Sequence, residues 1–161
     1  MSNKPPSLIR AAEIAELPTF PFRHPLNPQS EVHIRSLSAL AGLQRIGLHI
    51  GRIPPGRESF VYHYHHLEEE FVYILAGRGI AEIGEETHEV GPGDAMLFTA
   101  PSVGHHLRNP FDADLVYLMG GENRGFEIGE FPRLRKRGIF SQAGAYIVDA
   151  DAMQPFVPRS E

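Results

Sequence analysis

Residues 56–77 of the chain read GRESFVYHYHHLEEEFVYILAG, and most of the chemically active side chains of this region lie close together. Alternate residues of a β-strand point to one face, so His63 and His65 are expected to project together, with Cα atoms about 6.6 Å apart. The chain then turns, and Glu70 opens the returning strand beside them. Two imidazoles and a carboxylate arranged in this way can converge on one metal ion. The stretch therefore predicts a metal site on a β-scaffold.

A second stretch, GDAMLFTAPSVGHHLRN at residues 93–109, supplies a further histidine ligand. His105 shares a strand face with the apolar Leu107, whereas His106 shares the opposite face with Arg108. The apolar face of a strand packs on the core. We therefore predict that His105 points inward as a ligand, and that His106 points outward or supports the site from behind.

Composition excludes several other classes of protein. The 161 residues fit one domain, and the complete absence of cysteine excludes disulfide scaffolds and thiolate metal sites. A net charge of -5, with one short basic run at residues 133–137, argues against nucleic-acid binding. No apolar stretch approaches the length of a membrane span, and residues 1–6 lack the pattern of a signal peptide. The expectation is a cytoplasmic protein with no nucleic-acid or membrane partner.

The 16 glycines and 14 prolines interrupt the chain at short intervals, which favours short strands and turns over long helices. Residues 1–30 contain six prolines and are expected to form an arm, with a helical turn or two near residues 11–17. Gly84-Glu85-Glu86 is typical of a hairpin turn. Many short strands at close spacing favour a sandwich, a jelly roll or a barrel. The predicted strands span residues 31–37, 43–53, 60–66, 71–75, 80–83, 87–90, 95–99, 105–108, 115–119 and 145–148.

Both stretches resemble the two sequence motifs of the cupins, and the resemblance covers about residues 43–120. The first cupin motif runs Gly, five residues, His-x-His, three or four residues, Glu, six residues and Gly. Here six residues separate the first glycine from the first histidine, and Glu70 is preferred to Glu69 because it leaves six residues before Gly77. The resemblance implies a small single-domain protein of the cupin 2 type. Its fold would be an all-β double-stranded β-helix, the jelly-roll barrel.

The second cupin motif leaves two candidates for the last ligand. It runs Gly, five residues, Pro-x-Gly, two residues, His, three residues and Asn. His105 keeps the three-residue gap before Asn109, whereas His106 keeps the distance of five positions from Pro101. The strand-face argument favours His105. The predicted metal ligands are His63, His65, Glu70 and His105.

The resemblance also frames the expected organisation of the chain. We predict a proline-rich N-terminal arm over residues 1–30 and a cupin barrel over residues 31–125. Residues 126–161 would form a C-terminal extension that packs on the barrel or at a subunit interface. The arm is long enough to reach a neighbouring subunit, and small barrels must protect their strand edges. Cupins are often dimers, so a homodimer is predicted.

Three imidazoles and a carboxylate suit one divalent ion, Zn, Fe, Mn or Ni, and leave coordination positions open for a ligand. The resemblance implies a range of activities that includes oxygenases, isomerases, decarboxylases and lyases, together with proteins that only bind a ligand. The first hypothesis is a metal-dependent enzyme that acts on a small, oxygen-rich and anionic organic molecule. The alternatives are a non-catalytic metal or small-ligand binding module and a purely structural ion. The candidates for supporting residues around the metal are Tyr62, Tyr73, His49, Arg45, His106 and Asn109.

Overall fold

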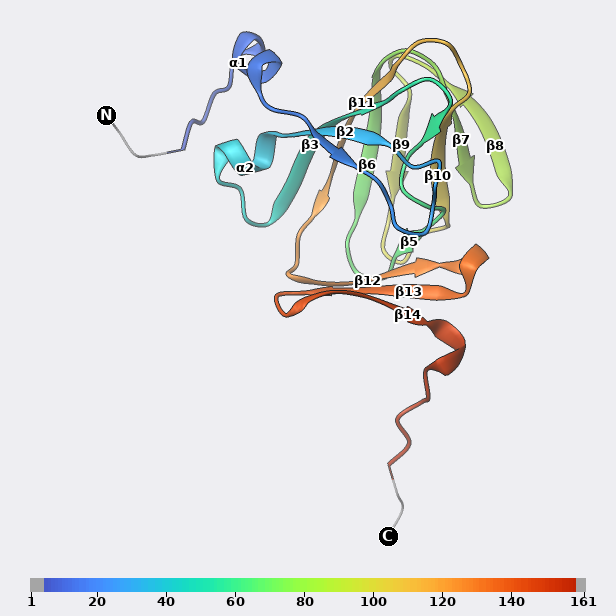
Figure 1. Cartoon of the computed structure of the whole chain (residues 1–161). Helices are drawn as coiled ribbons and strands as arrows, with labels where there is room; N and C mark the ends of the chain where they lie inside the picture. Colours follow the sequence, from blue (N-terminus) through green and yellow to red (C-terminus); the bar gives the residue numbers. More distant parts are fainter. Residues whose placement is uncertain (1–4, 159–161) are drawn as a thin grey trace.

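The computed structural model of the chain describes residues 5–158, in which fourteen strands form three antiparallel sheets (Figure 1). Two of these sheets form the predicted all-β jelly-roll barrel, and that prediction is confirmed. The first has six strands in the order β1-β2-β3-β11-β6-β9. Its strands are β1 (Phe20–Phe22), β2 (Val32–Ser36), β3 (Ile46–Ile53), β6 (Glu70–Ala76), β9 (Ala95–Phe98) and β11 (Leu115–Glu122).

The second sheet has four strands in the order β4-β10-β7-β8. The core lies between this sheet and the first. Ile53 and Leu115 come from the six-stranded sheet, Ala81 and Leu107 from the four-stranded one, and all four are buried in a single cluster. Removing such apolar side chains from water is the main force that holds the two sheets together. The strands of the second sheet are β4 (Arg57–Glu58), β7 (Gly79–Ile83), β8 (Glu86–Val90) and β10 (His105–Asn109).

The third sheet, in the order β14-β13-β12-β5, lies below the barrel in Figure 1. Three of its strands come from the C-terminal part of the chain, and the fourth, β5, lies inside the histidine-rich stretch. His65 of β5 pairs with Gly129 of β12, so the C-terminal strands join the barrel beside the predicted metal site. The strands are β5 (Tyr64–His65), β12 (Phe126–Phe131), β13 (Lys136–Ser141) and β14 (Gly144–Asp149).

The helices are short. Ser36 caps α2 by accepting a hydrogen bond from the Ala39 amide, and Gly42 ends this helix in the left-handed region at φ 67°. Within the described residues, neither α-helix is long and apolar enough to span a lipid bilayer. The helices are α1 (Ala11–Glu16) and α2 (Leu37–Ala41), with 3₁₀ turns at Pro132–Leu134 and Ala150–Ala152.

The predicted strand at residues 60–66 is wrong in extent, because only Tyr64–His65 form a regular strand. His63 exchanges backbone hydrogen bonds with His105 of β10, whereas the next two residues pair with β12. The segment therefore changes partner in its middle, and neither partner extends along all of it. Strands β12 and β13 were not predicted. They contain Gly129 and Gly138 and lack a regular alternation of polar and apolar residues.

Candidate metal centre

Three of the four predicted ligands form one compact cluster. Atoms of His63, Glu70 and His105 that could coordinate a metal ion all lie within 4.8 Å of one another. His63 and His105 face each other across an isolated bridge between antiparallel segments, and Glu70 is the first residue of β6. The Nε2 atom of His105 lies 2.5 Å from Oε1 of Glu70. Two stretches that are distant in the sequence, residues 63–70 and the start of β10, therefore converge at one end of the barrel.

His65 lies at the side of this cluster. Its Nε2 atom is 3.6 Å from Oε2 of Glu70, and its ring centroid is 5.1 Å from that of His63. The Nδ1 atom of His65 is buried and has no hydrogen-bond partner. The fourth predicted ligand is therefore adjacent to the compact group, with one ring nitrogen toward Glu70.

Two of the histidines have a fixed tautomer. Nδ1 of His63 lies 2.7 Å from the carbonyl oxygen of Val61, and Nδ1 of His105 lies 3.2 Å from that of Val103. A carbonyl oxygen only accepts hydrogen bonds, so each Nδ1 carries the proton and donates it. Each Nε2 atom keeps its lone pair. This arrangement, in which the outer nitrogen donates to a carbonyl, is typical of metal-ligating histidines.

The electrostatic environment gives the cluster the protonation state that a metal requires. Burial, reinforced by the neighbouring His105, lowers the pKa of His63 to about 3. Burial opposes the ionisation of Glu70, but the contact with His105 and the charges of the other two histidines lower the pKa of this carboxyl to about 2. At neutral pH, His63 is therefore neutral and Glu70 is ionised, as metal ligands must be.

The Oε1 atom of Glu70 provides a direct test of whether a cation fits here. This oxygen is buried and has no hydrogen-bond partner: Nε2 of His105 lies 2.5 Å from it, but the proton of that ring is on Nδ1. A buried carboxylate oxygen without a donor is costly. A cation held between this oxygen and the two Nε2 lone pairs would remove that cost, so the donor set fits a divalent metal.

Phe98 of β9 supports the cluster and was not predicted. Its ring stacks on the ring of His105, with centroids 3.8 Å apart and an interplanar angle of 15°. Phe98 is also the register partner of Glu70 across β6 and β9. One buried aromatic ring therefore contacts one candidate ligand and is paired with another. Its only sequence signal is apolarity, which is shared by every core position.

His106 lies on the opposite strand face from His105, as predicted. Of the two positions expected for it, outward or behind the site, the outward one is wrong. Its side chain is buried, with the charged groups of Glu58, Glu82, Arg108 and Arg133 near it. Nε2 of His106 lies 3.7 Å from Oε2 of Glu58, without a hydrogen bond. Burial lowers the pKa of His106. The residue belongs to a separate polar group behind the strand.

Three of the predicted supporting residues lie away from the cluster. The Tyr62 hydroxyl donates to the carbonyl of Gly84 at 3.0 Å, and the guanidinium of Arg133 covers the Tyr62 ring. Tyr73 is exposed on β6, and Arg45 is exposed before β3. Their sequence proximity to the motif does not bring them to the site.

The other two candidates have clearer roles. Asn109 is buried, and its amide donates to the carbonyls of Ile53 and Ala113 at 2.9 and 2.8 Å. It therefore holds the connection between β10 and β11 together. His49 of β3 lines a cavity of about 170 Å³ that also contacts His65 and Glu70, and burial lowers the pKa of His49. His49 therefore shares a cavity with two of the candidate ligands.

Tyr117 of β11 is a buried residue that sequence reasoning missed. It lines a small cavity between the sheets, together with Glu70, His63 and His105. The Tyr117 ring packs directly against Gly51. A Cβ atom added to Gly51 would lie only 2.5 Å from the Tyr117 ring. Burial, with a contribution from the charge of Glu70, raises the pKa of Tyr117 well above its usual range. A neutral phenol therefore lies at the inner side of the cluster.

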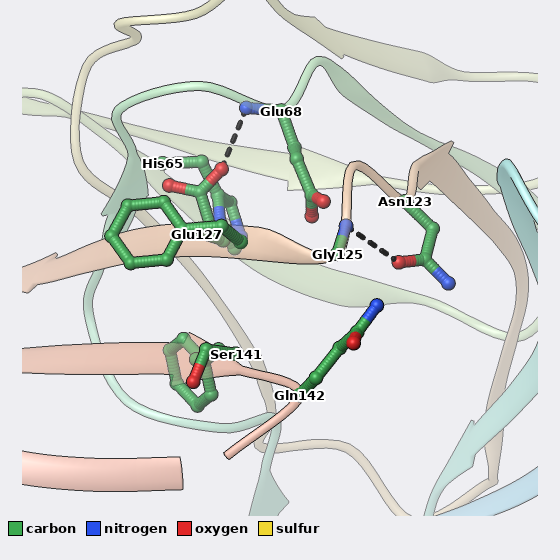
Figure 2. Close-up of a pocket in the computed structure, with 9 residues that line it drawn as sticks. His65, Glu68, Asn123, Gly125, Glu127, Ser141 and Gln142 are labelled. Atoms are coloured by element: carbon green, nitrogen blue, oxygen red, sulfur yellow. Dashed lines mark hydrogen bonds between the residues drawn. The ribbon is translucent and has the colours of Figure 1, made fainter. Parts of the chain in front are cut away.

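Glu127 of β12 is a second residue that was missed, and it organises the connection between His65 and Glu70. Its buried carboxylate accepts hydrogen bonds from the backbone amides of residues 66, 67 and 68, with the Glu68 amide at 2.7 Å. Figure 2 shows this contact beside His65, in a pocket that Ser141 of β13 also lines. A strand outside both motifs therefore fixes the loop that sets the spacing of two candidate ligands.

A larger cavity of about 440 Å³ opens onto His63, His65 and Glu70. Its outer walls come from the N-terminal arm and the C-terminal sheet. His24, for which the sequence suggested no role, also lines it, and its ring lies edge-on to Phe131 at 5.4 Å. No local pattern in the arm or in the C-terminal segment indicates that these parts meet at the predicted site.

Comparison with known proteins identifies related chains. The family model described as "Cupin domain" matches residues 49–121. The crystal structure of a candidate sugar phosphate isomerase from Acidithiobacillus ferrooxidans is 30% identical, covers 94% of this chain and 97% of its own, and superposes with a TM-score of 0.88. A sugar phosphate isomerase from a cupin superfamily, from Silicibacter pomeroyi, is 23% identical, covers 87% of this chain and 90% of its own, and has a TM-score of 0.77. The latter likeness concerns the fold alone.

A curated relative from Methanocaldococcus jannaschii is uncharacterized. It is 33% identical over 66 residues, which cover 41% of this chain and 51% of the relative. The chain thus spans about half the length of this curated relative.

Proposed function

The chain belongs to the cupin superfamily, and from this premise we propose that it is a metal-dependent enzyme acting on a small oxygen-bearing molecule. His63, His65, Glu70 and His105 would hold one divalent cation. The observation that carries this proposal is the buried, unpartnered Glu70 oxygen beside the Nε2 atoms of His63 and His105, whose outer nitrogens donate to carbonyls. A divalent cation bound there would polarise an oxygen atom of the substrate.

The remaining residues of the site would orient and protect this group. The carbonyls of Val61 and Val103 hold two imidazoles in the tautomer that leaves Nε2 free. Phe98 covers one face of His105. Three neutral imidazoles and one carboxylate would leave a charge of about +1 on a divalent ion, which favours a substrate with anionic or carbonyl oxygens. The donor set suits Zn, Fe, Mn or Ni.

Isomerisation next to a carbonyl is the reaction class that we favour. The relative from Acidithiobacillus ferrooxidans is similar over nearly the whole of both chains, and its name includes sugar phosphate isomerase. Such a reaction moves a proton between neighbouring carbons and needs a polarised carbonyl oxygen. The alternative, a non-catalytic binding module, would bind the same metal and ligand without turnover.

Metal analysis of the untagged protein, followed by competition titration against a chelator, tests the proposal. We expect one divalent ion per chain. His105→Ala should abolish this stoichiometry, whereas His106→Ala should retain it. His88→Ala is a matched control, because His88 is an exposed histidine on β8. Absence of a stoichiometric metal would contradict the proposed function. A metal-loaded protein that isomerises no hydroxy-carbonyl substrate would favour the binding module instead.

A further inference from the structure

The cavity in front of the candidate metal ligands is walled mainly by aromatic and aliphatic side chains. Phe60 lies edge-on to His63 with centroids 6.2 Å apart, and Phe22 of the arm lies edge-on to Phe60 at 5.1 Å. The opposite wall consists of side chains from β13 and β14, namely Phe140, Tyr146 and Ile147. An aromatic surface therefore begins at the ligand cluster and continues outward along both walls.

These walls are apolar and yet open to solvent. Exposed fractions are 39% for Phe22, 40% for Phe140, 54% for Tyr146 and 41% for Ile147. Clustered apolar side chains around a concave site indicate a surface that a ligand covers. The volume of about 440 Å³ falls within the range of small-molecule sites in proteins.

The charges around the cavity restrict what can fill it. Among the residues that the structure describes, no lysine or arginine lines this cavity, and neither α-helix points its N-terminus into it. Proteins hold phosphate groups with guanidinium or ammonium groups or with helix N-termini. The ionisable groups of the lining are His24, His63, His65, Glu70 and the phenol of Tyr146. The polar end of this lining is thus the candidate metal cluster itself.

We propose that the substrate has an uncharged aromatic body and an oxygen-bearing head, and that it carries no phosphate. This proposal rests on the proposed function, since the head requires the metal centre. The body packs between Phe22 of the arm and Tyr146 of β14, and the head presents a carbonyl and a carboxylate oxygen to the cluster. A residual positive charge at the metal complements the anionic head, while the aromatic walls complement the body.

Three ligands test this assignment on protein loaded with Zn²⁺. Phenylpyruvate and pyruvate have the same 2-oxo acid head and differ only in the phenyl ring, and fructose 6-phosphate represents a sugar phosphate. We expect calorimetric titration to show phenylpyruvate binding about tenfold more tightly than pyruvate, because the ring covers apolar surface. Fructose 6-phosphate should bind more weakly than phenylpyruvate.

Two wall variants and a matched control locate the effect. Phe22→Ala and Tyr146→Ala should each remove most of the preference for phenylpyruvate and leave the affinity for pyruvate unchanged. Phe20→Ala is the control, because Phe20 belongs to the same strand and is exposed, but does not line the cavity. It should alter neither affinity. Tyr146→Ala covers the case in which the arm variant folds poorly.

The outcomes separate the substrate class from the proposed function. Equal binding of phenylpyruvate and pyruvate, no binding of either, or tighter binding of fructose 6-phosphate, in protein with one metal per chain, would overturn the substrate class alone. A chain that binds no metal would overturn both proposals. If light scattering shows a dimer that Tyr146→Ala dissociates, and phenylpyruvate does not bind, the aromatic walls are a subunit interface and the substrate class is wrong.

Discussion

The two sides of the cavity differ in origin and in chemistry. The inner side carries His63, His65, Glu70 and His105, all within the segment that matches the cupin family model. The outer side is aromatic and comes mainly from the arm and from β12–β14, which lie outside that segment, with Phe60 from inside it. The inner side presents donor atoms fixed by hydrogen bonds and burial, whereas the outer side presents half-exposed rings. Under the proposed function, metal binding and the choice of substrate would therefore depend on separate parts of the chain.

The largest expected effect is on the inner side. Glu70→Gln replaces the anionic oxygen by a neutral amide, and we expect metal affinity to fall at least about 100-fold, beyond the usual effect of outer-shell changes. Chelator competition measures this. Glu89→Gln, an exposed carboxylate on β8, is the control and should leave metal affinity unchanged. Unchanged metal affinity in Glu70→Gln would mean that the carboxylate on the inner side does not bind the metal, and that the inner side is not a metal site of the kind proposed.

The next prediction tests whether β12 of the third sheet also positions the candidate ligands on the inner side. Glu127→Gln removes a carboxylate that accepts hydrogen bonds from the backbone amides of residues 66–68. The loop between His65 and Glu70 should therefore be held less firmly. We expect metal affinity to fall by about 10- to 100-fold, as for groups that orient ligands. The same titration, run beside the exposed control Glu86→Gln, measures it. A loss of thermal stability with unaltered metal affinity would limit Glu127 to a structural role.

A third variant should affect stability alone. Asn109→Ala removes a buried hydrogen bond to the carbonyl of Ile53 and a half-buried one to that of Ala113, so the free energy of unfolding should fall by about 1–3 kcal/mol. Denaturant titration measures the loss. Metal affinity should stay within about twofold of wild type, because the Asn109 amide makes its contacts with the β10–β11 connection. A large loss of metal affinity would connect this residue with the inner side.

Lowering the pH should reduce the folding stability of the metal-free protein, because His63 and Glu70 on the inner side titrate differently in the folded and unfolded chain. The pKa of His63 is about 3 in the folded chain and near 6.5 when unfolded, so between these pH values only the unfolded chain takes up the proton. Stability should therefore decrease as the pH falls from 6.5 toward 3, by at most about 1.4 kcal/mol per pH unit for one proton. Glu70, with a pKa of about 2 against 4.5, acts in the same direction below pH 4.5. Melting temperatures of wild type and His63→Gln, measured as a function of pH, test this. The melting temperature of the variant should depend less on pH than that of wild type. The same pH dependence in both proteins would contradict the prediction.

The smallest effect is expected on the outer side. Tyr146→Ser alters an exposed side chain at the edge of the third sheet, and unfolding free energy should change by no more than about 0.5 kcal/mol. Thermal denaturation measures it. A larger destabilisation would indicate that the aromatic wall contributes to folding, in the way that the barrel core does.

Some of the site could be predicted from the sequence because it depends on neighbouring residues. Alternation along the strand brings the rings of His63 and His65 near each other, and the length of the turn places Glu70 beside them. The hairpin of β7 and β8 follows from Gly84, which adopts the left-handed conformation at φ 58° that the turn requires. That these side chains bind a metal stays a prediction.

Other parts of the prediction failed where the answer depends on a second, distant segment. His106 is buried rather than outward-facing, since strand alternation assigns a face but does not show what covers it. The predicted strand over residues 60–66 divides between two partners, one of which is β12. Tyr73 and Arg45 are near the motif in sequence and away from it in space.

The sequence by itself therefore determined the all-β barrel, the cupin family and the set of candidate ligands. The strands and the candidate ligands follow from short-range geometry, namely strand alternation, turn chemistry and spacing, whereas the family and its barrel came from the resemblance of two motifs. Only the tertiary structure decided that Glu127 holds the loop beside His65 and that Phe22 and Tyr146 form opposite walls of the cavity. Phe22 and Tyr146, which line the same cavity, are 124 positions apart (146 − 22), and no local pattern encodes such an arrangement, because it arises from how whole sheets pack against each other.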